Sequence, residues 1–213
     1  MKQYMMMKMI AFTVALLLTP GGCSAGPVPT TQALLLTPLE TIMNARTLAA
    51  RVYERASDAY DTFIQDEFGG DSGFCVEDIT WNELFSVRIP TLEWRNFGDE
   101  ERLQRLRRDL QLFGLFLDEV LLDEQDKQGH TDTADKVQQT IHQLDGLMVA
   151  IAIANDAMGF IPPTDVTEIM SDSLRDPATE SARAIRDCVV LRDFKTLVER
   201  GHRDFTLLSR KYS

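Results

Sequence analysis

Residues 37–67 read TPLETIMNARTLAARVYERASDAYDTFIQDE, and this stretch carries the signals of a long amphipathic helix. Thr37 can cap the helix, Pro38 suits its first position, and Glu40 completes a capping box. Apolar residues then recur in steps of three and four, at Ile42, Ala45, Ala49, Val52, Ala56, Ala59 or Tyr60, and Phe63. This spacing predicts a helix over about 38–67, which ends before Gly69 and Gly70.

The same helical period recurs in three later segments. Leucine and phenylalanine predict a helix over about 99–122, and mixed aliphatic residues predict another over about 132–158. The Asp176-Pro177 pair predicts the start of a fourth helix over about 177–210. No segment has a convincing strand pattern, so the sequence predicts an all-α fold with four long helices.

Two of the three links between these helices are long. The first runs from Gly69 to about Gly98, roughly 30 residues without a sustained helical period, and the third runs from Pro162 to Arg175. Long links can cross the length of a helix, so we expect a long-chain four-helix bundle with up-up-down-down topology. This arrangement is typical of helical growth hormones and cytokines.

The charge of the chain excludes one class of partner. Among 213 residues, 22 are Lys or Arg and 33 are Asp or Glu, which gives a formal net charge of −11. Nucleic-acid binding depends on basic side chains that neutralise phosphates, so we expect no nucleic-acid partner.

The N-terminus has the pattern of a secretory signal peptide. Lys2 and Lys8 precede an apolar run over residues 9–18, and Cys23-Ser24-Ala25 offers small residues for cleavage. We expect residues 1–25 to be removed, residues 26–213 to form the helical domain, and the product to be secreted. A retained membrane anchor is the less favoured reading because the run is short for a bilayer. A bacterial lipoprotein with a lipid on Cys23 is a further alternative.

Two cysteines remain after this cleavage, Cys75 and Cys188. In an oxidising compartment they favour a single disulfide bond. Cys188 shares a helical face with Ile185 and Leu191, so a buried free thiol is the alternative.

The sequence offers no pattern for catalysis or for cofactor binding. It contains no Gly-rich phosphate loop and no Gly-x-Ser-x-Gly motif. His130, His142 and His202 do not form an i, i+4 pair, so we expect no metal site. These observations predict a protein that is not an enzyme and needs no cofactor.

Several segments resemble the interleukin-6-type helical cytokines, in the branch of leukemia inhibitory factor, oncostatin M and ciliary neurotrophic factor. The spacing of Tyr60 and Cys75, together with Cys188, is similar to that branch. Residues 94–103 (WRNFGDEERL) resemble its approach to the second helix, and residues 159–162 (GFIP) resemble the exit from the third. Residues 191–195 (LRDFK) and 203–208 (RDFTLL) resemble the closing half of the last helix.

The resemblance implies a secreted, monomeric ligand that activates Janus kinases and STAT transcription factors. It would bind a shared glycoprotein-130-type receptor through the first and third helices, a surface called site two, without inserting into a membrane. Alignment on Tyr60 places Glu40, Met43 and Thr47 there on the first helix, and Gly146 and Ala150 on the third. The alternative for Gly146-x-x-x-Ala150 is close helix packing inside the bundle.

The resemblance also implies a second class I cytokine receptor, bound at site three near the start of the last helix. The branch carries a Phe-x-x-Lys motif there, but Ser181 and Ala184 occupy those positions in this chain. Trp81, Phe85 or Trp94 would then supply the aromatic anchor, or the second receptor differs. An alternative is a chain similar to the interleukin-27 alpha subunit, which acts with a soluble receptor-like partner.

Overall fold

The computed structural model describes residues 36–75, 87–127, 132–162, 166 and 170–213. The predicted signal peptide, Trp81 and Phe85 lie outside these ranges. Every regular element in the described ranges is a helix, as the sequence predicts. The elements are α1 (Pro38–Phe68), η1 (Ser72–Phe74), α2 (Thr91–Asn96), α3 (Asp99–Asp126), α4 (Asp132–Ala157), α5 (Asp172–Arg175) and α6 (Glu180–Lys211).

The four long helices agree with the predicted ranges to within a few residues. The predicted capping box is present, since the Glu40 amide donates to Thr37 Oγ1 at 3.3 Å and the Thr37 amide donates to Glu40 Oε2 at 2.8 Å. Gly69 adopts φ of 60° after the last turn of α1, a conformation that suits glycine. The helix start at Asp176-Pro177 was wrong by three residues, because Thr179 is the residue that caps α6 through the amide of Ala182.

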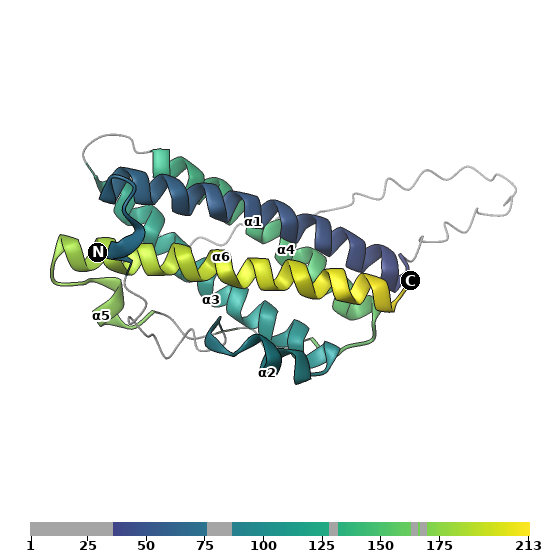
Figure 1. Cartoon of the computed structure of the whole chain (residues 1–213). Coiled ribbons are helices and arrows are strands. Elements are labelled where there is room, and N and C mark those ends of the chain that lie inside the picture. The colour runs from purple at the N-terminus through teal and green to yellow at the C-terminus, as the bar shows by residue number, and fades with distance from the viewer. Residues whose placement is uncertain (1–35, 76–86, 128–131, 163–165, 167–169) are drawn as a thin grey trace, which may run out of the picture. The chain divides into compact units, whose positions relative to one another are not determined.

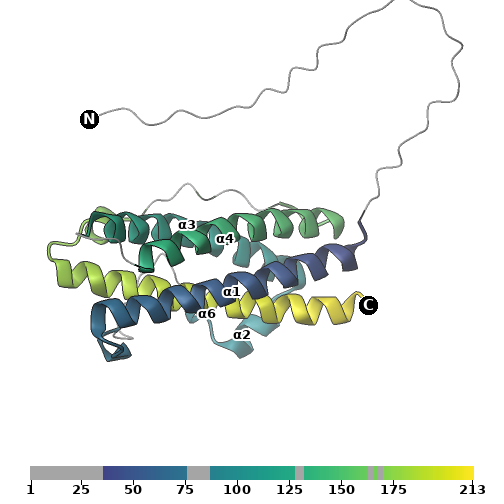
Figure 2. The same cartoon turned by 90° about the horizontal axis from the view of Figure 1, so that it is seen from above.

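The long helices pack in four pairs. α1 packs against α4 and α6, and α3 packs against the same two helices (Figure 1, Figure 2). The buried side chains form one apolar core, and large aromatic groups meet inside it. Phe113 of α3 and Phe194 of α6, for example, have ring centroids 5.6 Å apart. We conclude that the protein is a helical bundle.

Polar contacts identify which helix ends lie together. Thr133, at the start of α4, donates from Oγ1 to Asp66 Oδ2 near the end of α1 at 2.7 Å. Lys127, just after α3, pairs with Glu67 at the end of α1. The start of α6 contacts the end of α3 through Arg186 and Asp123, and Lys211 at the end of α6 pairs with Asp99 at the start of α3.

The helices α3 and α6 approach closely at Gly201. A Cβ atom at this position would lie 3.0 Å from Cδ2 of Leu106, so a larger residue would push against the core. The sequence gave no hint of this contact, because glycine inside a helix is otherwise unfavourable.

Cys75 and Cys188 form the predicted disulfide bond, with Cα atoms 5.7 Å apart. Both residues are buried in the core. The bond joins the segment that follows η1 to the second turn region of α6, and Arg192 supports this junction by donating to the Cys75 carbonyl oxygen at 3.2 Å.

Candidate receptor-binding surfaces

The residues predicted for site two on α1 lie on its solvent side. Glu40, Met43 and Thr47 are all exposed, and Met43 exposes 51% of its surface. An exposed methionine at this position contributes apolar area without packing in the bundle. These three residues are therefore available to a partner.

The two predicted residues on α4 have different environments. Gly146 is exposed, and a Cβ atom there would meet nothing within 4 Å. Ala150 is only 2% exposed and belongs to the core, so its prediction as a surface residue was wrong. Its small side chain packs inside the bundle, which is the alternative that the sequence left open.

The structure adds two apolar residues to this region of α4. Val149 exposes 60% and Ile153 exposes 45% of its surface, and with Gly146 they follow a spacing of three and four residues. This spacing places them on one face of the helix, away from the buried residues Leu147, Ile151 and Ala154. Separating the exposed stripe from the buried one would have identified them from the sequence.

The surface residues of α1 and α4 lie at a similar height along the bundle. α4 runs back along α1, since Thr133 contacts Asp66 and Lys136 lies 3.8 Å from Asp58. Met43 is about four turns before Asp58, and Ile153 is about five turns after Lys136. A partner seated across these two helices could therefore contact Met43 and Ile153 together.

Trp94 does not form the exposed anchor predicted for site three. It is 2% exposed, and its indole Nε1 donates to Asp204 Oδ2 at 2.7 Å. The guanidinium of Arg200 lies over the ring at 4.9 Å, and Arg200 also donates to the carbonyl oxygens of Val87 and Ile89. These contacts fasten the segment before α3 onto α6.

Ser181 and Ala184 lie beside a groove at the end of the bundle. Ser181 is exposed and Ala184 is half-buried. The groove has a volume of about 500 Å³. It is bounded by the end of α1, the end of α3 and the start of α6, and we call it the end groove. Its lining residues are Glu67, Asp123, Asp126, Lys127, Pro177, Ala178, Thr179, Glu180, Arg183, Ala184 and Asp187.

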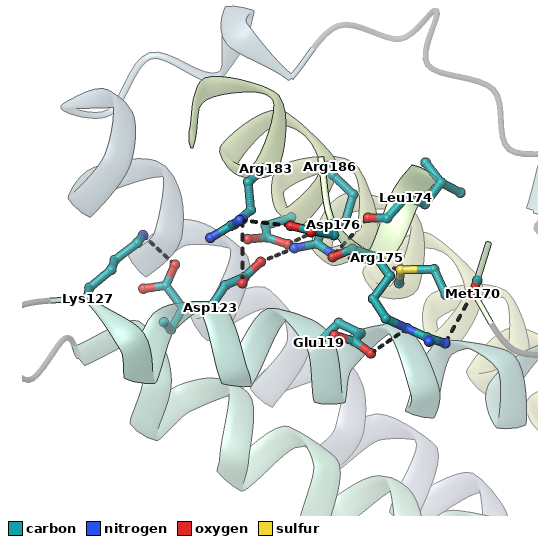
Figure 3. Close-up of polar contacts among 11 residues, drawn as sticks. Glu119, Asp123, Lys127, Met170, Leu174, Arg175, Asp176, Arg183 and Arg186 are labelled. Atoms are coloured by element: carbon teal, nitrogen blue, oxygen red, sulfur yellow. Dashed lines mark hydrogen bonds and ion pairs between the residues drawn. The ribbon is translucent and has the colours of Figure 1, made fainter. Parts of the chain in front are cut away.

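Ion pairs connect the walls of the end groove (Figure 3). Arg186 of α6 pairs with Asp123 of α3, and Arg183 lies 3.6 Å from Asp123 and 3.4 Å from Asp176. Lys127 donates to Glu124 at 2.6 Å and also pairs with Glu67. Opposite charges thus hold α1, α3 and α6 together around the groove.

Two buried carboxyl groups have strongly shifted pKa values. Burial raises the pKa of Asp187 to about 8, although Arg186 opposes the shift. Burial likewise raises the pKa of Asp109 to about 7, opposed by the charges of Arg108, Arg105 and Arg200. Both groups therefore bind a proton more tightly in the folded protein than in the unfolded chain.

These shifts predict that stability falls as the pH rises from about 4 to about 8. The folded state holds protons on Asp187 and Asp109 that the unfolded chain has already released, so higher pH favours unfolding in this range. Asp187→Asn should flatten this dependence, which urea unfolding at several pH values measures. Asp58→Asn is the matched control on α1, and a variant curve that parallels the wild type would contradict the assignment to Asp187.

The described ranges contain no cluster of three or more His, Cys, Asp or Glu side chains that is arranged to hold a metal ion. Within the same ranges, no helix combines the length and the apolar character that crossing a bilayer requires.

Comparison with protein-family models and with curated proteins finds no match to this chain.

Proposed function

We propose that this protein is a secreted helical cytokine that brings together a glycoprotein-130-type receptor and a second class I cytokine receptor. Receptor pairing would activate Janus kinase and STAT signalling. The proposal draws on the sequence resemblance and on the exposed surfaces of the bundle. It requires a bundle topology, a receptor-binding face and export of the chain.

The contacts between helix ends support an up-up-down-down topology. The ends of α1 and α3 meet through Glu67 and Lys127, so these two helices run in the same direction. The start of α4 meets the end of α1 at Thr133 and Asp66, and Arg186 places the start of α6 beside the end of α3. α4 and α6 therefore run back, and the long first link returns the chain to the start of α3.

The observation that carries the proposal is the apolar surface on α1 and α4. Met43, Val149 and Ile153 are about half exposed or more, and Gly146 leaves open space between the α4 residues. Exposed apolar groups around a flat position suit a receptor aromatic side chain, because desolvated aromatic contacts near the centre of an interface supply much of the binding energy.

Gly146→Arg tests this surface. The substitution should reduce affinity for the purified ectodomain of a glycoprotein-130-type receptor by about 100-fold, because the new side chain would occupy the place of the receptor aromatic. Folding should be unaffected, since no atom lies within 4 Å of the added Cβ. Surface plasmon resonance gives the affinities.

Leu122→Arg is the control for this experiment. Leu122 is 55% exposed on α3, so it tests an added arginine on an apolar surface residue outside α1 and α4. We expect wild-type affinity from this variant. Equal receptor binding by Gly146→Arg and the wild type would show that the α1–α4 surface is not site two.

The second candidate is an interleukin-27 alpha-like subunit that acts with a soluble receptor-like partner. The absence of Phe and Lys at Ser181 and Ala184 favours it, and the burial of Trp94 removes one substitute anchor. Expression alone and with a soluble receptor-like chain separates the two candidates. Secretion of an active protein without the second chain would exclude the subunit.

A further inference from the structure

The end groove is lined by more acidic than basic side chains. Five carboxyl groups face it, from α1, α3 and α6, whereas Lys127 and Arg183 are its basic residues. Both basic side chains already pair with carboxylates within the bundle, Lys127 with Glu67 and Glu124, and Arg183 with Asp123 and Asp176. The internal ion pairs therefore leave an excess of negative charge in the groove.

Two acidic side chains on opposite walls have no internal partner. Asp126 at the end of α3 and Glu180 at the start of α6 are exposed, and neither makes an ion pair or a side-chain hydrogen bond within the described residues. Carboxylates on facing walls of a groove can both reach a single cation placed between them. A guanidinium group suits this arrangement because it offers five donors in a planar fork.

Asp187 adds an incompletely satisfied polar group to the lining. The residue is 2% exposed, and its Oδ1 atom accepts no hydrogen bond. Arg186 Nε lies 2.6 Å from this oxygen, but the pair lacks hydrogen-bond geometry. A buried carboxylate oxygen without a hydrogen bond is costly in free energy, so a donor that enters the groove would be stabilised there.

We infer that the end groove receives a basic side chain, arginine or lysine, from the second receptor. This inference rests on the proposed function, and it reverses the polarity that the resemblance implies. The resembled branch presents a lysine at the start of its last helix, whereas this chain presents a carboxylate-lined groove in the same region. Both the missing lysine at Ala184 and the acidic walls follow from one change of partner chemistry.

The charge of the whole chain supports the same partner. A net charge of −11 attracts a basic surface over a distance, and the groove then selects one side chain at close range. The association rate should therefore fall with increasing ionic strength. A partner that buried only apolar groups would show little such dependence.

A short peptide tests the chemistry of the groove without knowledge of the receptor. The probe is acetyl-Gly-Arg-Gly-amide, titrated into the isotope-labelled protein and followed by NMR, with acetyl-Gly-Gln-Gly-amide as the neutral comparison. We expect saturable shifts at the amides of Asp126, Glu180 and Asp187 with the arginine peptide, and at least fivefold weaker binding of the glutamine peptide. Equal affinities for the two peptides would overturn the inference.

The double variant Asp126→Asn/Glu180→Gln removes the two unpaired carboxylates. It should bind the arginine peptide about tenfold more weakly, whereas the matched double variant Glu54→Gln/Asp58→Asn on the exposed side of α1 should bind as the wild type does. Both double variants lose the same net charge, so a general loss of electrostatic attraction would weaken them equally. Equal weakening, or wild-type binding by the groove variant, would contradict the proposed site.

Cell signalling separates this inference from the proposed function. The groove variant should keep wild-type affinity for the glycoprotein-130-type ectodomain but lose STAT activation, whereas Gly146→Arg should lose the ectodomain and keep the peptide shifts. Full signalling by the groove variant would overturn the inference alone. Failure of the wild type to bind the ectodomain would instead remove the cytokine proposal while the peptide result remained valid.

Discussion

Replacing Cys75 and Cys188 together by alanine should lower the free energy of unfolding by about 4–5 kcal/mol. The two residues are 113 positions apart, so the bond closes a very long loop in the unfolded chain. By the chain-entropy argument, opening that loop stabilises the unfolded state. Both cysteines are buried, so alanine replaces them without placing a new polar group in the core.

Urea unfolding followed by circular dichroism measures this effect under non-reducing conditions. The wild-type protein treated with a thiol reductant is the control, and its midpoint should approach that of the double variant. A change below about 1 kcal/mol would show that the unfolded chain keeps the two segments together without the bond.

The second large effect is expected from Asp204→Ala. Asp204 is 4% exposed and accepts hydrogen bonds from Trp94 Nε1 at 2.7 Å and from Arg102 Nη1 at 3.3 Å. The substitution leaves the indole N–H without its partner and removes one of the two carboxylates that Arg102 contacts. Breaking a buried charged network in this way costs about 3–5 kcal/mol.

Trp94→Phe is the milder companion to this variant. It removes the indole N–H but leaves Asp204 paired with Arg102, so we expect a loss of about 1–2 kcal/mol in the same urea experiment. The order of the two losses is the informative result. A larger loss from Trp94→Phe than from Asp204→Ala would mean that packing of the indole, and not the ion network, holds this segment.

The long helices could be predicted from the sequence because their signals are local. The capping box of Thr37 and Glu40, the apolar period and the glycines after α1 act within a few residues of each other. The same applies to the range 99–122, where the structure extends the predicted helix only to Asp126. The Cys75–Cys188 bond followed from the count of cysteines, since two remain in the predicted mature chain.

The environment of Trp94 could not be predicted in this way. Its partners Asp204 and Arg200 lie more than 100 residues further along the chain, and no local pattern announces them. An exposed anchor and a buried, hydrogen-bonded indole look alike in the sequence. The same limit applies to Ala150, because a small residue is compatible with a flat surface and with close helix packing.

The sequence by itself determined that this chain forms long amphipathic helices, where they begin and end, and which side of each is apolar. These properties depend on neighbouring residues and on helical geometry. Only the tertiary structure decided which surfaces stay open, namely the α1–α4 face around Gly146 and the end groove between α1, α3 and α6. Both surfaces are formed by residues far apart in the chain, so they exist only after the helices have packed.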